Sequence, residues 1–194
     1  MKLQPQSVLG GAFGAASIVS RFQCDTARLQ ERADIGCVLL TSAVNADEIV
    51  NSAMRVCGME IPLVPGAVRI AAGRAALWLS PRSWLIQCEV EDEAQLVTRL
   101  NAAFPDALAH AVPLTDALCW FELSGPGSLT LLTEGGFVSL ERDGLPVGHA
   151  KRTLIAQVAA VVARESEVGW LIGVERSRAR YFVEWLSEAS GAGG

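Results

Sequence analysis

The spacing of apolar residues changes period near the end of the chain. Trp170, Ile172 and Val174 occupy alternate positions, which predicts one face of a strand because successive side chains of a strand point to opposite faces. Over residues 179–186 the apolar spacing becomes helical, so a helix is expected directly after that strand. Tyr181 and Trp185 lie four residues apart on a flank of the helical stripe. The helix therefore carries an aromatic edge in addition to its core face.

The first half of the chain predicts elements in the order β-α-β-β-α. Its first helix has clear signals, because Asn45 is a suitable N-cap, Glu48 lies three residues on, and Gly58 ends the apolar stripe. The prolines of residues 61–66 exclude a central strand there. The predicted elements are a strand at 35–40, a helix from Asn45 to Gly58, strands at 75–79 and 84–90 joined through 80–83, and a helix at 91–104.

The second half repeats this order. Pro126 suits the first position of a helix that Gly135 and Gly136 end. Trp84 and Trp170 occupy matching places 86 residues apart, which indicates an internal duplication. The predicted elements are a strand at 117–123, a helix starting at 124–127, one long Val/Ile/Ala run at 153–164, a strand at 170–175 and the closing helix.

This order predicts an α+β fold of two β-α-β-β-α units related by a pseudo-twofold axis. Each unit is expected to bury its helices against one face of a mostly antiparallel sheet. The expected organisation is an N-terminal arm at 1–34, partly extended, a duplicated domain at 35–186 with halves 35–110 and 111–186, and a flexible tail at 187–194. Residues 4–6 interrupt the charged start of the chain, which favours an arm over a signal peptide.

Composition points to partner surfaces and away from nucleic acid. Apolar residues make up 51% of the chain and charged residues 19%, with a mean hydropathy of +0.31. A chain of this size has more apolar surface than a small monomer usually hides. The net charge is -5 and the basic residues are scattered, which excludes a footprint for a phosphate backbone. No apolar run is long enough to span a membrane.

Few residues suggest chemistry. The five dispersed cysteines predict buried thiols in a reducing compartment, and two histidines cannot build a zinc site. The Gly-Pro-Gly-Ser segment at 125–128 lacks the pattern of a phosphate loop, so helix initiation is favoured over anion binding. The basic segment 148–153 is interpreted as a solvated loop. Glu141 and Asp143 lie near His149, but nothing resembles an activated nucleophile, so no catalytic, cofactor-binding or metal-binding residue is assigned.

With no chemical role assigned, the remaining candidates are residues that could contact a partner at the surface. Arg82 and Arg176 are expected at equivalent hinges, where a guanidinium can form an ion pair on the surface or hold an acidic partner. The five tryptophans are compatible with core packing and with interface anchors. The candidate partner-interface residues are Arg82, Trp84, Arg176, Arg178, Tyr181 and Trp185.

Several segments together resemble the gamma subunit of heterotetrameric sarcosine oxidase. They are the run 76–85, Gly125-Pro126 followed by Leu131-Leu132, the 148–153 segment with Arg152-Thr153, and Arg176-Ser177-x-Ala179-x-Tyr181 leading to Trp185-Leu186. The similarity covers nearly everything from Ile35 to Leu186. Arg178 departs from it, because the family pattern has an apolar residue at this place.

The resemblance implies a fold similar to the folate-binding domain of the glycine-cleavage aminomethyltransferase. It also implies a cytoplasmic complex in which the alpha subunit binds NAD and tetrahydrofolate, beta carries FAD and FMN, and delta holds zinc. Such a complex oxidises sarcosine to glycine and passes the methyl carbon to tetrahydrofolate, or releases formaldehyde with hydrogen peroxide. The gamma subunit of the family has no assigned catalytic residue and binds none of these cofactors itself.

Three alternatives stay open from the sequence. A related N-methylglutamate dehydrogenase uses a similar small subunit, which leaves the amine substrate undecided. A free-standing folate-binding or aminomethyltransferase-like protein would need a carboxylate in a central pocket, and no residue matches that role. A homo-oligomeric scaffold is distinguished from a gamma subunit by whether larger flavin-bearing chains purify with the protein.

Overall fold

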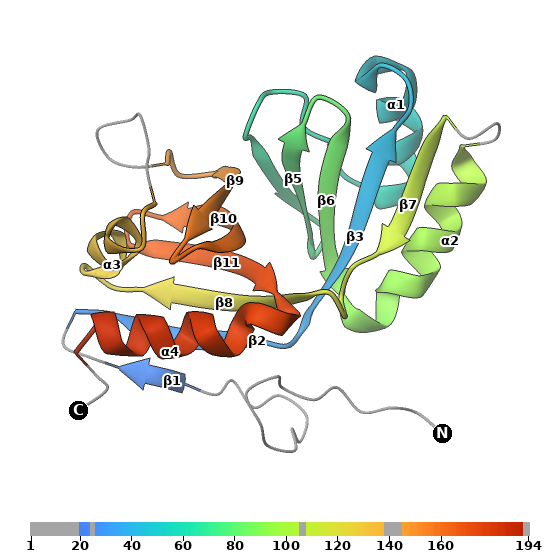
Figure 1. Cartoon of the computed structure of the whole chain (residues 1–194). Coiled ribbons are helices and arrows are strands. Elements are labelled where there is room, and N and C mark those ends of the chain that lie inside the picture. Colours follow the sequence, from blue (N-terminus) through green and yellow to red (C-terminus); the bar gives the residue numbers. More distant parts are fainter. Residues whose placement is uncertain (1–19, 24–25, 105–107, 138–144, 192–194) are drawn as a thin grey trace, which may run out of the picture. The chain divides into compact units, whose positions relative to one another are not determined.

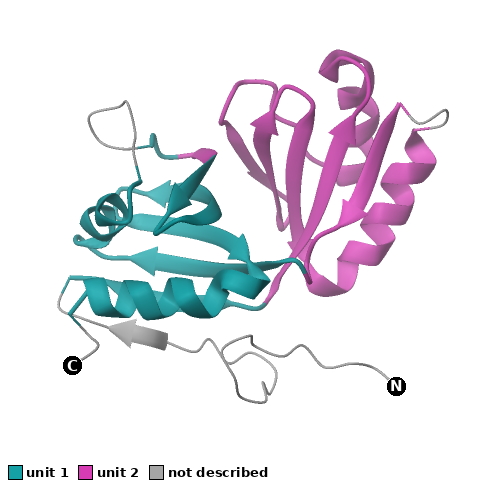
Figure 2. Ribbon diagram, viewed as in Figure 1, with its two compact units in different colours: residues 1–33, 117–147, 152–194 teal, residues 34–116, 148–151 magenta. Residues whose placement is uncertain are grey.

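The computed structural model describes residues 20–23, 26–104, 108–137 and 145–191 (Figure 1). The chain divides into two compact units, which Figure 2 shows in different colours. Unit 1 comprises residues 1–33, 117–147 and 152–194, and unit 2 comprises residues 34–116 and 148–151. Each unit is therefore assembled from stretches that are separated in the sequence.

Unit 2 is a five-stranded sheet covered on one face by two helices. The strand order is β4-β5-β6-β3-β7, and all four pairings are antiparallel. Apolar residues of both helices pack with Trp84 and Ile86 of the sheet in one core cluster. The elements are β3 (Ile35–Ser42), α1 (Ala46–Cys57), β4 (Val68–Ala71), β5 (Arg74–Ser80), β6 (Ser83–Glu89), the 3-10 turn η1 (Val90–Asp92), α2 (Glu93–Ala103) and β7 (Ala109–Pro113).

Unit 1 has a six-stranded sheet in the order β1-β2-β8-β11-β10-β9. The pairings of β1 with β2, β2 with β8, β8 with β11 and β11 with β10 are antiparallel. Helices α3 and α4 contribute Leu132, Phe182 and Leu186 to a core that includes Trp170 of β11. The elements are β1 (Ser20–Gln23), β2 (Arg28–Arg32), β8 (Leu118–Ser124), α3 (Ser128–Glu134), β9 (His149–Ile155), β10 (Val158–Ser166), β11 (Gly169–Glu175), the 3-10 turn η3 (Arg176–Arg178) and α4 (Ala179–Ala189).

The two units repeat one topology. In unit 2, Trp84 of β6 pairs with Leu40 of β3, and in unit 1, Trp170 of β11 pairs with Leu123 of β8. The strand on the other side of each tryptophan also keeps its register, with Trp78 opposite Trp84 and Arg164 opposite Trp170. The predicted α+β fold with antiparallel sheets is confirmed. The predicted pseudo-twofold axis concerns the placement of one unit relative to the other and stays a prediction.

Each unit takes one strand from the chain segment that leads into the other unit. Strand β2 directly precedes β3 of unit 2 but pairs with β8 of unit 1, and β7 directly precedes β8 but pairs with β3. Strands β4 and β7 are not among the elements predicted from the sequence, and the predicted boundary between residues 110 and 111 falls inside β7. Short strands of mixed polarity such as Ala109–Pro113 carry little periodic signal, which explains the omission.

The apolar run at 153–164 was predicted as one element, and this prediction was wrong. The run contains a hairpin, because Ala156 and Gln157 turn the chain between β9 and β10 with positive φ values of 49° and 64°. Two successive left-handed residues suit a tight hairpin but are usually signalled by Asn or Gly. The turn at the matching place in unit 2, Ala72-Gly73, does contain a glycine.

Helix boundaries follow the sequence signals with three corrections. Helix α1 begins after Asn45 and ends at the left-handed Gly58 as predicted, although the Asn45 side chain makes no capping hydrogen bond. Helix α3 begins at Ser128, so Pro126 precedes the helix instead of occupying its first position. Helix α4 extends to Ala189, beyond the predicted end of the domain. Most of the predicted arm and the end of the tail lie outside the described residues.

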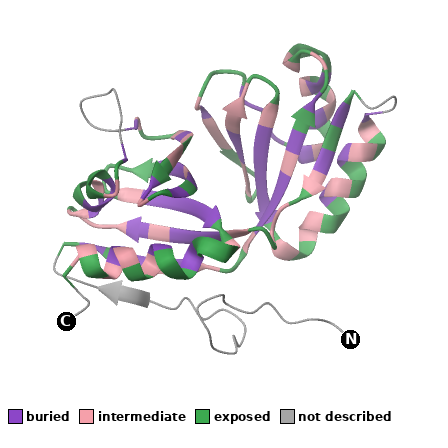
Figure 3. Ribbon diagram, viewed as in Figure 1, coloured by how far each residue is buried: buried purple, intermediate pink, exposed green. Residues whose placement is uncertain are grey.

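Burial is continuous along the central strands β6 and β11, each of which has five buried residues in succession, and Figure 3 shows where buried and exposed residues lie. Large core side chains such as Trp84, Trp170 and Phe182 are fully buried. Each contributes about 1.5–3 kcal/mol or more to folding by removing apolar surface from water. Within the described residues, no helix combines the length and the apolar character needed to cross a bilayer.

Candidate functional site

The segment from β11 through η3 into α4 is the candidate site. Helix α4 is held by a core stripe of Ala179, Phe182 and Leu186, all fully buried. The Phe182 ring lies 6.0 Å from the ring of Phe121 on β8, measured between centroids. At the start of the segment, the backbone N–H of Arg176 donates to the carbonyl of Ala117 at 2.9 Å. These contacts fix which face of α4 is turned away from the core.

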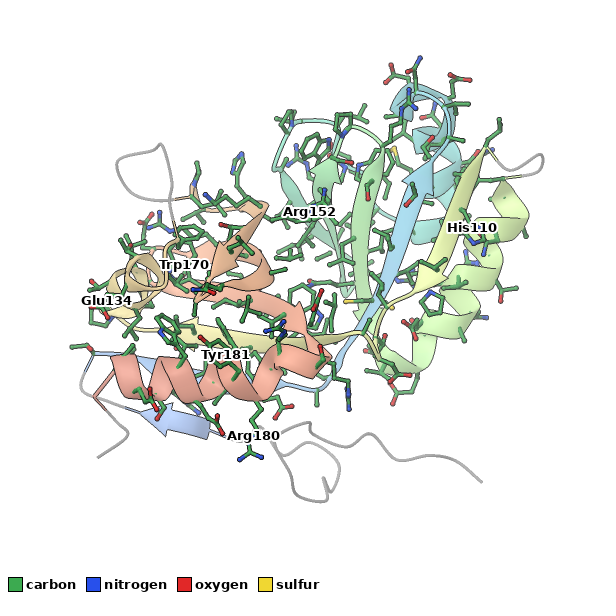
Figure 4. The ribbon with its side chains drawn as sticks, viewed as in Figure 1. His110, Glu134, Arg152, Trp170, Arg180 and Tyr181 are labelled. Atoms are coloured by element: carbon green, nitrogen blue, oxygen red, sulfur yellow. The ribbon has the colours of Figure 1, made fainter. Side chains whose placement is uncertain are left out.

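A second stripe runs along α4 beside the core stripe. We define it as Arg178, Tyr181 and Trp185, which are spaced by three and four residues and therefore lie on one side of the helix. Arg178 is exposed, and Tyr181 is one of the few large apolar side chains that are exposed, at 50%. Figure 4 labels Tyr181 on this helix. The second stripe thus combines a cation with aromatic surface.

Trp185 is partly buried because its ring lies on α3. A Cβ atom added to Gly135, the C-cap of α3, would lie 2.7 Å from the Trp185 ring and 2.5 Å from Ile155. Trp185 also packs against the core cluster of unit 1. The indole therefore has a structural role, and only its outer part is available to a partner. Tyr181 is the more accessible ring.

The arginines of this segment have different surroundings. Arg180 forms an ion pair with Glu184 one turn along the helix, at 2.8 Å between Nε and Oε1, and projects outward (Figure 4). Arg176 and Glu31 both act on Cys119, whose pKa burial raises to about 11, with Arg176 lowering it and Glu31 raising it. Arg176 and Glu31 therefore act on the same buried thiol with opposite sign. Arg178 makes no ion pair or side-chain hydrogen bond within the described residues.

The other two interface candidates lie in unit 2. Arg82 is exposed in the turn between β5 and β6, where its carbonyl accepts a hydrogen bond from Ser42 N–H. In the register that matches Trp84 with Trp170, the residue equivalent to Arg82 is Val168. The expectation that Arg82 and Arg176 are equivalent was therefore wrong. Trp84 is fully buried, and its indole N–H donates to the carbonyl of Pro62 at 2.7 Å. Trp84 is a core residue, which corrects its assignment to a partner interface.

The Gly-Pro-Gly-Ser segment is a packing element. The backbone N–H of Gly127 donates to the carbonyl of Thr26, and a Cβ at Gly127 would collide with the Thr26 side chain at 2.6 Å. The Ser128 hydroxyl donates to the carbonyls of Gly125 and Val168. The groups that an anion would need are thus used to hold the start of β2, in agreement with the preference for a structural role.

The basic segment 148–153 is a strand instead of a solvated loop. Strand β9 begins at His149, and Ala150 N–H donates to the carbonyl of Gly66 at 2.7 Å. His149 and Lys151 are partly buried, and burial lowers the pKa of Lys151. Glu141 and Asp143, the carboxylates considered beside His149, lie outside the described residues.

The cysteines agree with the expectation of buried thiols for the four that the structure describes. Cys37, Cys57, Cys88 and Cys119 are buried and free. Burial raises the pKa of Cys57 and of Cys88 to about 11, so both are protonated at neutral pH and poor nucleophiles. Among the described residues, no three His, Cys, Asp or Glu side chains gather where they could hold a metal ion.

Two polar groups with structural importance were missed in the sequence. Arg164 is buried beside Trp170, 5.1 Å from the ring centroid, and donates to the carbonyls of Leu145, Ser166 and Glu167. Glu93 accepts hydrogen bonds from the backbone N–H groups of residues 114 and 115 and from the hydroxyl of Thr115. Arg164 could have been noticed in the sequence as a charged residue at the end of an apolar run. Nothing in the local sequence indicates the long-range contact of Glu93.

Comparison with solved structures supports the α+β topology described above. The chain is similar to a chain of the heterotetrameric sarcosine oxidase from Corynebacterium sp. U-96, solved with pyrrole 2-carboxylate, with a TM-score of 0.76 and 24% identity over 86% of this chain and 85% of that one. It is also similar to aminomethyltransferase T of the glycine cleavage system from Bartonella henselae, with a TM-score of 0.64 and 13% identity. That match covers 84% of this chain and 45% of the transferase. At these identities both likenesses concern the fold.

Sequence comparisons give one match and one negative result. No curated protein matches the chain. The family described as "Sarcosine oxidase, gamma subunit family" matches residues 43–192, from the end of β3 through α4. Because this match spans most of the sequence, the chain belongs to the sarcosine oxidase gamma subunit family.

Proposed function

We propose that this chain is the gamma subunit of a heterotetrameric sarcosine oxidase. The observation that carries the proposal is the family match over residues 43–192, and the likeness in fold to a chain of a heterotetrameric sarcosine oxidase supports it. The complex would oxidise sarcosine to glycine, with transfer of the one-carbon unit to tetrahydrofolate or release of formaldehyde and hydrogen peroxide. Its partners would be alpha, beta and delta subunits in the cytoplasm.

The chain itself would act as a docked, non-catalytic subunit. FAD, FMN, NAD, zinc and tetrahydrofolate would be carried by the other subunits. Two features support this division of roles: the buried thiols have raised pKa values, and the Gly-Pro-Gly-Ser segment uses its donor groups internally. The second stripe of α4 would be part of the docking surface, because Tyr181 exposes apolar area beside an arginine.

The decisive experiment is purification of the tagged chain from its source cells. We expect larger chains to purify with it in a constant ratio, with a flavin absorbance spectrum and sarcosine-dependent reduction of that flavin. Preferential oxidation of N-methylglutamate by the same assembly would assign the chain to the related dehydrogenase. A purified chain that brings no flavin-bearing partner would contradict the proposal.

The docking surface is tested with Tyr181→Ala. Exposed aromatic anchors cost about 2 kcal/mol or more in association when truncated. We expect the variant to fold like the wild type and to assemble more weakly. The matched control is Gln95→Ala, because Gln95 is the exposed residue at the equivalent position of α2. Wild-type assembly of the Tyr181 variant would remove this ring from the interface.

A further inference from the structure

The starts of α2 and α4 are equivalent in position and opposite in charge. The register that matches Trp84 with Trp170 also matches Asp92 with Arg178, each the N-cap of its helix. Helix α2 starts after Glu91 and Asp92 and has Glu93 as its first residue. Helix α4 starts after Arg176 and Arg178, has Arg180 as its second residue, and carries no acid in its first turn. One copy of the duplicated element is acidic where the other is basic.

The basic residues at the start of α4 do not favour the helix through its dipole. The first N–H groups of a helix point outward and give its N-terminus a partial positive charge, which carboxylates stabilise and cations oppose. No side chain caps α4, so the N-terminal N–H groups receive no compensating acceptor from the N-cap residue. Residues that oppose the stability of an element are typical of surfaces that serve another purpose.

The equivalent side chains of α2 are engaged within unit 2. Asp92 forms an ion pair with Arg74 at 3.1 Å, and Arg99, the counterpart of Trp185, donates to the carbonyl of Val56 at 3.1 Å. In α4, by contrast, Arg178 has no such partner within the described residues, and Tyr181 exposes half of its surface. Asp92 is thus used within the fold of unit 2, whereas its counterpart Arg178 is exposed to solvent.

We propose that the second stripe of α4 receives an acidic segment of another subunit of the complex. The proposal rests on the gamma-subunit function proposed above and names the chemistry of the partner. A carboxylate of that segment would accept hydrogen bonds from the forked guanidinium of Arg178 beside the positive end of the helix. Apolar parts of the segment would cover Tyr181 and the outer part of Trp185. The positive charge that Arg178 adds at the N-terminus of α4, which opposes the stability of the free helix, then strengthens the complex.

An acidic protein segment fits this surface better than the other possible occupants. A small anion could pair with Arg178 but would leave the exposed apolar area of Tyr181 uncovered. A second copy of this chain carries a net charge of -5, so repulsion between copies opposes its association. The experiments below distinguish both of these occupants from an acidic segment.

The first test replaces the positive charge at the N-cap of α4 with the negative charge that α2 has at the equivalent position. In Arg178→Asp the isolated full chain should keep its melting temperature or gain a few degrees, because an acid now faces the helix N-terminus. Flavin-bearing chains, released from the purified assembly in high salt, are then titrated with wild-type or variant chain. We expect binding to weaken about tenfold or more and to lose part of its salt dependence.

The matched control is Arg55→Asp. Arg55 is an exposed arginine at the opposite end of a helix, in the last turn of α1, where its charge favours the helix. This variant should lower the melting temperature slightly and bind the flavin-bearing chains like the wild type. Equal binding of Arg178→Asp and wild type at every salt concentration would overturn the proposal, as would equal weakening by both variants.

The second test identifies the occupant chemically. Arg178→Lys keeps the positive charge and supplies an amine that a carbodiimide can couple to a neighbouring carboxylate. We expect a cross-link from Lys at position 178 to an Asp or Glu of another subunit. A cross-link to a second copy of this chain, or none in an intact assembly, would overturn the proposal.

The two proposals fail in different ways. If the wild-type chain brings no flavin-bearing subunit, the gamma-subunit function fails and the acidic partner fails with it. If the assembly forms but Arg178→Asp joins it normally and no cross-link appears, only the acidic partner fails.

Discussion

The central tryptophans of the two units occupy the same register but are held differently. Trp84 of unit 2 is fully buried and donates its indole N–H to Pro62. Trp170 of unit 1 is equally buried, yet its indole N–H has no acceptor within the described residues, and its ring instead meets Phe137 edge-on and the guanidinium of Arg164. Duplication thus preserved the pairing of the strands while the surroundings of each core changed independently.

The same contrast applies to the glycines that end the first helix of each unit. Gly58, after α1, is left-handed with φ of 70° and has open space at its Cβ position. Gly135, after α3, has an ordinary φ of -73° but is covered by Ile155 and Trp185. One glycine is needed for its backbone conformation and the other for close packing, although both look alike in the sequence.

The largest effect is expected from the tryptophans. Trp84→Phe removes ring volume and leaves a buried carbonyl without its donor, so it should reduce the free energy of unfolding by about 2–4 kcal/mol. Trp170→Phe also removes volume and the stacking on Arg164 but eliminates an unpaired donor, and should cost about 1–2 kcal/mol. Urea unfolding of both variants measures the difference, and equal losses would contradict the distinction between the two cores.

Glu93 should produce the next largest effect. Its carboxylate accepts three hydrogen bonds from residues 114 and 115, which connect β7 to β8. Glu93→Ala should cost about 2 kcal/mol, because donors near a charged acceptor lose their partner. Glu93→Gln retains one acceptor oxygen and should cost less. Ala179, the equivalent residue in unit 1, cannot make these hydrogen bonds. If Glu93→Gln lowered the free energy of unfolding as much as Glu93→Ala, the negative charge alone would matter.

Substitution of the two glycines should separate steric from conformational requirements. Gly135→Ala should cost about 1–3 kcal/mol through collision with the two covering side chains. In a Trp185→Ala background this cost should shrink by at least about 0.5 kcal/mol. Gly58→Ala should cost about 1–2 kcal/mol because of its left-handed conformation, with no coupling to Trp185. Additive behaviour of Gly135 and Trp185 in thermal unfolding would contradict the packing described for α3 and α4.

The smallest expected effect is electrostatic. Burial and the Glu122 carboxylate raise the pKa of Glu165, and Arg32 opposes the shift. The folded chain therefore holds this proton more tightly than the unfolded chain, so stability falls as the pH rises from about the ordinary value of the group through the raised pKa. Glu165→Gln should remove this dependence and gain less than about 1 kcal/mol at neutral pH, because solvent still reaches Glu165 and weakens the effect of its partial burial. The counterpart in unit 2, Leu79, carries no charge. Unfolding free energies at pH 4.5 and 7 check this, and an unchanged slope in the variant would contradict it.

Local periodicity predicted the central elements of both units well. The helical spacing from Ala179 is strong because one face of α4 is buried and the others are not, and the strand around Trp170 is recognisable as a short apolar run that is buried along most of its length. Strand β7 and the exchange of β2 were missed, since pairing between distant segments leaves no local signal. The turn at Ala156-Gln157 was missed because its residues are not typical of a tight hairpin.

The candidate site was predicted in part. Arg178, Tyr181 and Trp185 do lie on one side of α4, because helical spacing determines such neighbours from sequence alone. Trp84 was misplaced, because a buried and an exposed indole have the same local pattern, and only the acceptor at Pro62 distinguishes them. The opposite charges at the starts of α2 and α4 could be read from the sequence only once the register of the duplication was known.

Hydrogen exchange of the full chain, alone and in the purified assembly, tests the central claim most directly. Backbone amides of α2 and α4 are compared, since the two helices are equivalent in topology but only α4 has the second stripe. We predict that assembly slows the exchange of the backbone amides of α4 around Tyr181, with little change along α2. Protection of α2 with no change in α4 would contradict the assignment of the second stripe as the docking surface.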